Sequence, residues 1–83
     1  MSLYYFHLRD GQDTLLDPDG REFASLDQVR QAALADARTL IAADALEGVI
    51  DLRYHLAVEN AAGKIVHSVE FEDAVKVVPK TAK

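Results

Sequence analysis

The chain has 83 residues, of which 49% are hydrophobic and 28% charged, and its 14 acids and 9 bases give a formal net charge of −5. This composition is that of a folded protein rather than a disordered chain, and the length leaves room for one core. The negative charge disfavours nucleic acid as a partner, and no apolar run approaches the roughly 20 residues that span a bilayer. Because the chain has no cysteine and its first residues do not form a secretory signal, we expect a cytoplasmic protein.

Two short β segments are expected to follow a first strand. Residues 3–8 are rich in aromatic side chains and precede Asp10-Gly11, a turn signal, which predicts the first strand. Residues 14–16 and 21–23 flank the run Asp17-Pro18-Asp19-Gly20. Proline at the second position and glycine at the fourth favour a tight turn, so we expect these segments to form a short hairpin.

A long helix is expected to begin at Leu26. Ser25 and Gln28 have the spacing of a capping box, in which both side chains bind free amides at a helix start. Gly48 is expected to end the helix. Apolar residues recur between these limits at helical spacing and form one stripe that should face the core. Its members are Leu26, Val29, Ala33, Ala37, Leu40 and Ile41.

Strict alternation predicts a C-terminal hairpin, with residues 51–59 and 64–71 as strands around the loop of residues 60–63. A plain four-residue loop sets a register in which apolar side chains face one another. The pairs are Val58 with Ile65, Leu56 with His67, Tyr54 with Val69, and Leu52 with Phe71. The same register places opposite charges opposite each other on the other face, which supports it. These pairs are Glu59 with Lys64 and Arg53 with Glu70.

The sequence therefore predicts an α+β fold in which a small antiparallel sheet packs on one long helix. The sheet would comprise an N-terminal strand, a short hairpin and a C-terminal hairpin. Residues 1–79 would form a single domain and residues 80–83 a frayed tail, while residues 72–78 fit either a short strand or a single helical turn. The expected core residues are Phe6, Val29, Leu40, Leu56 and Phe71.

Three histidines are the candidates for a base or a metal ligand. The alternation places His55 on the polar side of its hairpin and His67 on the apolar side, so these two point away from each other. His7 and His67 remain as a pair that could approach across the sheet and form a small-ligand or metal-sensing site. No cysteine or third ligand at zinc spacing accompanies them, which favours a structural role for each imidazole. We therefore predict no metal and no cofactor.

The sequence also lacks the motifs of a calcium site, a catalytic nucleophile and a phosphate-binding loop. The acidic turn around Gly20 has the composition of a calcium loop, but alignment on that glycine puts Leu15 and Leu26 at two ligand positions. The serines lie outside any nucleophile motif, and there is no glycine-rich phosphate loop. The sequence thus predicts a protein that is not an enzyme and has no catalytic residues.

The first strand carries apolar and aromatic side chains on both faces, although one helix can cover only one face of a sheet. The face formed by Leu3, Tyr5 and His7 is our candidate interface, because exposed aromatic groups on a strand are typical of partner surfaces. A protein partner or self-association through this face is expected, and Tyr5→Ser should weaken it. The alternative is that residues 14–23 or 75–78 fold over these side chains.

The N-terminal pattern Tyr5-Phe6-x-Leu8-x-Asp10-Gly11, the turn Asp17-x-x-Gly20, the alanine-rich helix and Val69-x-Phe71-x-x-Ala74-Val75 together resemble a known family. It comprises short proteins common in rhizobia and related α-proteobacteria and is catalogued as a domain of unknown function. The resemblance covers nearly the whole chain and implies a bacterial source. Its motifs are turns and core positions, so no functional residue is carried over. The function expected is that of a small non-enzymatic protein-interaction module, with a homodimer as one form.

Overall fold

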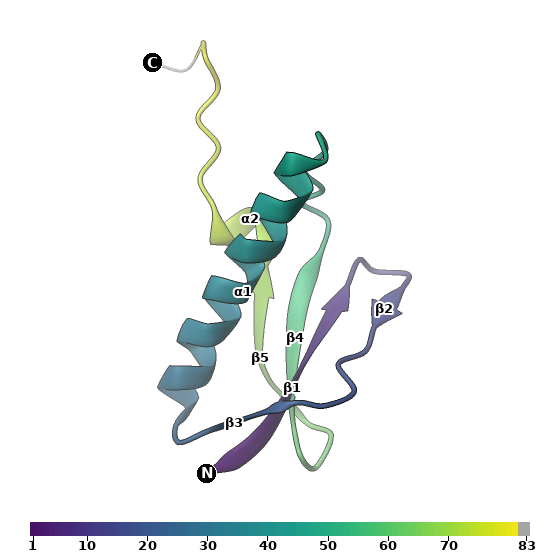
Figure 1. Cartoon of the computed structure of the whole chain (residues 1–83), viewed down its shortest axis with the longest axis vertical. Coiled ribbons are helices and arrows are strands. Elements are labelled where there is room, and N and C mark those ends of the chain that lie inside the picture. Colours follow the sequence, from purple (N-terminus) through teal and green to yellow (C-terminus); the bar gives the residue numbers. More distant parts are fainter. Residues whose placement is uncertain (82–83) are drawn as a thin grey trace.

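A small antiparallel sheet and one long helix form the two layers of the computed structural model, which describes residues 1–81 (Figure 1). The elements are β1 (Ser2–Arg9), β2 (Thr14–Leu15), β3 (Arg21–Phe23), α1 (Leu26–Leu46), β4 (His55–Asn60), β5 (Ile65–Glu70) and α2 (Phe71–Ala74). The strand order is β2-β1-β4-β5, and β3 also pairs with β1. The predicted α+β class, with one long helix on an antiparallel sheet, is confirmed.

The limits of α1 follow from local side-chain chemistry. The Ser25 hydroxyl accepts a hydrogen bond from the Gln28 N–H at 3.2 Å, and Gln28 Oε1 accepts one from the Ala24 N–H at 3.0 Å. These bonds satisfy amides that have no partner inside the helix. At the other end Gly48 has a φ of +89°, which a residue without Cβ adopts without strain. Both predicted helix limits are therefore confirmed.

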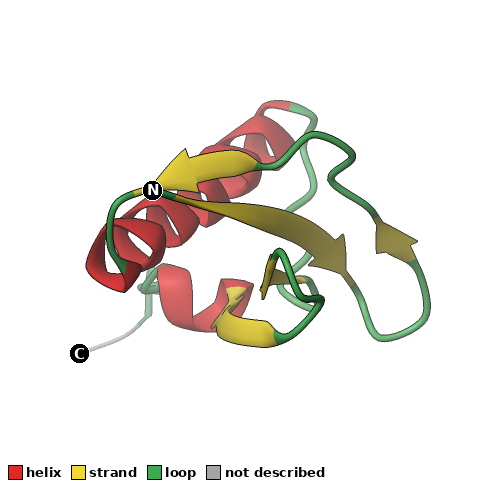
Figure 2. Ribbon diagram, turned by 90° about the horizontal axis from the view of Figure 1, so that it is seen from below, coloured by secondary structure: helices red, strands yellow, loops and turns green. Residues whose placement is uncertain are grey.

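The core lies between α1 and the facing side of the sheet (Figure 2). The helix contributes a stripe of small and branched side chains, which are Val29, Ala33, Ala37 and Ile41. Four of the five predicted core residues are buried, namely Phe6, Val29, Leu56 and Phe71. Leu40 is half-buried at the edge of this core, and Leu26 remains 40% exposed.

The short hairpin expected over residues 14–23 does not form. β2 and β3 both pair with β1, at Leu8↔Leu15 and Tyr4↔Arg21, so the chain continues along one edge instead of reversing. Between these pairs residues 5–7 of β1 lie against residues 16–20, and the longer segment bulges outward. The prediction was wrong because the long free edge of β1 offers more backbone hydrogen bonds than two short segments can give each other.

The C-terminal hairpin forms, but Glu59 faces Ile65 instead of Lys64 and a β-bulge follows, so the register beyond the bulge is shifted by two residues from the expected one. Leu56 faces Val69 and Val58 faces His67, whereas Glu59 faces Ile65, which leaves Val66 without a partner opposite it. A bulge changes which face the following residues occupy. Accordingly Val66 packs against the core, while Ile65 is 43% exposed.

The chain that precedes β4 is turned rather than extended, so the predicted pair of Arg53 and Glu70 is also absent. The Asp51 carboxylate accepts hydrogen bonds from the Arg53 backbone and from its guanidinium, at 2.8–3.0 Å. Phe71 begins α2 instead of extending the strand, and its N–H donates to the Tyr54 carbonyl at 3.0 Å. Of the two alternatives for residues 72–78, a single helical turn is thus present at the start, and residues 76–79 have no regular structure.

Arg38 fixes the position of α2. Its Nε donates to the Ala74 carbonyl at 2.8 Å, which holds the end of α2 against α1. The chain then leaves the body of the molecule (Figure 1). Residues 82–83 of the predicted frayed tail lie outside the described residues.

Candidate functional site

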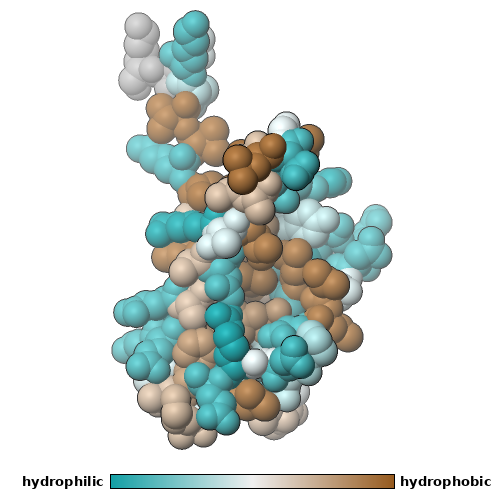
Figure 3. Space-filling view, in the orientation of Figure 1, coloured by the Kyte–Doolittle hydropathy of each residue, from teal (hydrophilic) through white to brown (hydrophobic). Residues whose placement is uncertain are grey.

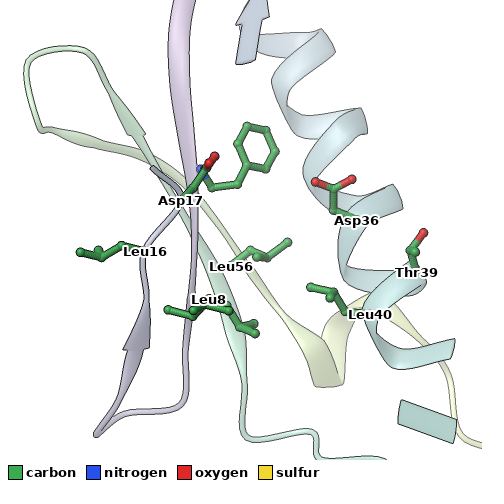
Figure 4. A pocket seen from close by; sticks show the side chains of 9 residues that line it. Leu8, Leu16, Asp17, Asp36, Thr39, Leu40 and Leu56 are labelled. Carbon is green, nitrogen blue, oxygen red and sulfur yellow. The ribbon is translucent and has the colours of Figure 1, made fainter. Parts of the chain in front are cut away.

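An apolar groove lies between α1 and the edge formed by β1 and β2, with a volume of about 350 Å³. In Figure 4 the side chains of Leu40 and Leu56 point toward each other across it, and Leu16 lies at its outer rim. Its lining residues are Phe6, Leu8, Leu15, Leu16, Asp17, Asp36, Thr39, Leu40 and Leu56. We call this set the groove.

The groove is open because the helix and the edge strands diverge. α1 packs on β3, β4 and β5, whereas β2 lies at the far end of the sheet, where β1 and β2 turn away from the helix (Figure 1). Leu8 faces Leu15 in the sheet, so both side chains occupy the helix side. Leu15 is nonetheless 70% exposed and Leu16 is 64% exposed. Figure 3 shows hydrophobic side chains gathered on this side of the helix.

An ion pair bridges the sheet and the helix next to the groove. The Arg21 guanidinium pairs with the Asp36 carboxylate, which joins β3 to α1. The same guanidinium lies over the Phe6 ring, 4.3 Å from its centroid, where the face of the ring attracts a cation. This bridge holds α1 and β3 together, so the groove is open only beyond it.

Asp17 joins the bulged segment of residues 16–20 to the middle of β1. One carboxylate oxygen accepts from the Phe6 N–H at 3.1 Å, and the other accepts from the N–H groups of Asp19 and Gly20 at 3.2 and 3.1 Å. The side chain thereby replaces the strand partner that the bulge takes away from β1. Leu16 directly precedes this anchor, so its position at the rim of the groove is fixed.

The Asp17 carboxylate is a fixed negative charge beside the groove. Partial burial raises its pKa, but the three backbone donors together outweigh this effect and lower the pKa below the ordinary value of 3.8. Asp17 is consequently ionised at neutral pH. A partner that enters the groove thus meets leucine side chains, the Asp36 carboxylate paired with Arg21, and the ionised Asp17 carboxylate.

His7 lies under the same segment and is 5% exposed. Its Nδ1 accepts a hydrogen bond from the Asp17 N–H at 3.1 Å, so the ring proton is on Nε2. Nε2 in turn lies 3.2 Å from Glu59 Oε2, to which it donates. The Tyr5 ring stacks on the imidazole, with centroids 6.3 Å apart and planes 8° apart. Both ring nitrogens are therefore engaged in supporting the bulged segment.

The predicted interface residues lie together on the sheet face away from α1, but they differ in exposure. Leu3 and Tyr5 are half-buried, and His7 is buried. Gly20 closes over Tyr5, because a Cβ on Gly20 would lie 3.0 Å from the Tyr5 ring. The alternative that residues 14–23 fold over this face thus applies to His7, whose side chain is not available to a partner. An interface through Leu3 and Tyr5 stays a prediction.

The structure does not bring the three histidines together. His7 faces Ala57, which faces Ser68, whereas His67 faces Val58, so His7 and His67 lie on opposite faces of the sheet. His55 lies on the His7 face and is 3.7 Å from Glu70. In residues 1–81 there is no group of three or more histidine and acidic side chains that could hold a metal ion.

The sequence contains one signal for the groove. Leu15 and Leu16 are adjacent, and adjacent residues of an extended chain point in opposite directions. At the outermost position of a small sheet, at least one of two such leucines is exposed. Neither helix among the described residues is long and apolar enough to cross a membrane.

One comparison with known proteins gives a match. The sequence model of a family described as a domain of unknown function (DUF6894) matches residues 3–72. No curated protein and no solved structure matches the chain. The match confirms the resemblance carried by the N-terminal, turn and C-terminal motifs, while the bacterial range stays a prediction.

Proposed function

The chain belongs to this family of unknown function, and from that premise we propose that it is a small non-enzymatic protein-interaction module. It binds an apolar segment of a protein partner in the groove between α1 and β2. The interaction is driven by burial of leucine side chains, and the Asp17 carboxylate selects a segment that carries a positive charge.

The observation that supports this proposal is the exposure of two leucines on a surface that is already concave. Leu15 and Leu16 are 70% and 64% exposed beside the half-buried Leu8 and Leu40. Burial of one leucine contributes about 1.5–3 kcal/mol. A domain of this size has little stability to spare, and an apolar hollow that its own helix leaves uncovered is typical of a partner surface.

The polar side chains that hold the bulged segment of residues 16–20 have structural contacts that leave them unsuited to catalysis. A general base needs a free lone pair within reach of a substrate. The Nδ1 lone pair of His7 accepts from the Asp17 backbone, and its Nε2 donates to Glu59. The Asp17 oxygens accept three backbone N–H groups. These contacts give both side chains a structural role.

The proposed compartment is the cytoplasm. Small domains in oxidising compartments are typically stabilised by disulfides, and this chain has no cysteine to form one. Nucleic acid is not a proposed partner, because the formal charge of −5 repels phosphate.

Site-specific photocrosslinking tests the proposed groove. The photoreactive residue p-benzoylphenylalanine is placed at position 16 of the full chain, and a matched probe is placed at Val49, which is 69% exposed and lies outside the groove. Both proteins are irradiated in living cells, and the crosslinked peptides are identified by mass spectrometry. We expect a crosslink from position 16 to an apolar segment, abolished by Leu40→Asp in the same chain. Equal crosslinking from both positions, or none from position 16, would contradict the proposal.

A further inference from the structure

The segment of residues 76–80, which we call the tail, leaves two apolar side chains uncovered. Val77 is 67% exposed and Val78 is 68% exposed. They are flanked by Lys76 and Lys80, and the segment has neither helix nor strand. Because adjacent side chains of an extended segment point to opposite sides, such a tail can insert one valine into a hollow and cover its rim with the other.

The base of the tail is fixed. Ala74 is buried and its carbonyl accepts from Arg38, while Val75 packs against the core. The tail therefore starts from a defined point on the body. In Figure 1 it leaves on the left of α1, whereas β2 lies on the right.

The tail and the groove are complementary in chemistry. The groove presents leucines and the ionised carboxylate of Asp17. The tail presents two valines between two lysines. We propose that the groove is occupied by the tail of a second copy of this chain, with Val77 and Val78 against the leucines and a lysine facing Asp17. This inference rests on the proposed function and names its partner.

The tail cannot fill the groove of its own chain. Five extended residues span at most about 18 Å. A helix with its side chains is about 10–12 Å across, so the path halfway around α1 alone is about 17 Å. Val78 is only the third residue of the tail and lies at most about 11 Å from its start, so the two valines do not reach the groove of their own chain, and the proposed contact is made between two copies. Since each copy has one tail and one groove, two reciprocal contacts close a symmetric dimer.

Sedimentation velocity of the full chain over a wide concentration range tests this proposal. Wild type should shift from monomer to dimer as concentration rises. Leu16→Asp in the groove and Val77→Asp in the tail should each weaken association at least tenfold. The matched control Val49→Asp should leave it unchanged, since Val49 is exposed but outside both segments. Circular dichroism verifies that all three variants fold.

A mixing experiment separates tail-in-groove exchange from any other dimer. The Leu16→Asp chain keeps an intact tail and the Val77→Asp chain keeps an intact groove. Mixed, they should form a one-to-one heterodimer although neither forms a homodimer. Failure to form it would overturn the proposal. Exchanging both Lys76 and Lys80 for glutamate should weaken wild-type association several-fold in low salt and less in high salt.

The result also distinguishes this inference from the proposed function. A wild-type chain that stays monomeric at every concentration would overturn the second copy as the partner. If position 16 then still crosslinks to an apolar segment of a different protein, the groove remains a binding site and only its occupant is wrong. If it crosslinks to nothing, both proposals are refuted.

Discussion

Replacing Asp17 by alanine removes the acceptor that ties the bulged segment to β1. The N–H groups of Phe6 and Gly20 make part-buried hydrogen bonds and lose their partner, at about 1–3 kcal/mol each, while the exposed N–H of Asp19 turns to water at about 0.5 kcal/mol. We expect Asp17→Ala to destabilise the fold by at least about 2 kcal/mol. For a domain of this size a loss of 2 kcal/mol lowers the Tm by about 8–16 °C.

Urea denaturation followed by circular dichroism measures this loss, with Asp19→Ala as the matched control. Asp19 is exposed, and within the described residues only its backbone N–H joins the hydrogen bonds of the segment. The control should therefore stay within about 0.5 kcal/mol of wild type. Equal losses in the two variants would refute the role assigned to the Asp17 carboxylate.

The difference in stability between wild type and Asp17→Ala is expected to depend on pH in the acid range. The pKa of Asp17 is lower in the folded chain than its ordinary value of 3.8, so the unfolded chain binds the proton more readily. The stabilisation is complete above that ordinary value and is lost as pH falls through the lower, folded value. The gap between wild type and Asp17→Ala should consequently be constant near neutral pH and shrink below about pH 4. A gap that grows in acid would contradict the carboxylate contacts.

Three further predictions concern the fold. Gly20→Ala should destabilise the fold by about 1–3 kcal/mol more than Gly63→Ala. Both glycines have positive φ, but only a Cβ on Gly20 meets backbone, at 2.9 Å from the Tyr4 carbonyl oxygen. Equal losses of stability in urea would contradict this. Leu56→Ala should cost about 2–5 kcal/mol, since Leu56 is 3% exposed, and a melt unchanged from wild type would contradict its place in the core. Burial lowers the pKa of His67, so wild type should lose stability as pH falls below about 6.5, and His67→Gln should lose less; identical pH profiles would contradict this.

Features set by neighbouring residues were predictable from the sequence. The cap formed by Ser25 and Gln28 and the glycine that ends α1 depend on contacts within one turn, and both are present. The side of the C-terminal hairpin that faces the core was also predictable, because alternation places Leu56 and Val58 on one face.

Features set by competition between distant partners were not predictable. The turn at Asp17-Pro18 is compatible with both a hairpin and a bulge, and the free edge of β1 decides between them. The register of the C-terminal hairpin differs for a similar reason, since the sequence of the loop alone specifies neither the pairing of Glu59 with Ile65 nor the extra residue at Val66.

The sequence predicted that a partner surface exists but did not predict its location. Surplus apolar groups on the first strand indicated a partner surface, but they did not show which face would be covered. His7 is covered by the segment that Asp17 anchors, and the uncovered surface lies instead on the helix side, at Leu15 and Leu16. That outcome depends on the divergence between α1 and β2, a property of the packed elements rather than of any one segment.

Two-dimensional NMR of the isotope-labelled full chain, recorded during dilution from millimolar to micromolar concentration, tests the central claim most directly. If the tail of one copy binds the groove of another, the amide signals that shift on dilution should belong to groove residues such as Leu16 and Thr39 and to Val77 and Val78 of the tail. Signals of Leu3 and Tyr5, on the opposite face of the sheet, should stay in place. Shifts confined to Leu3 and Tyr5, or no shift at any residue, would contradict the account.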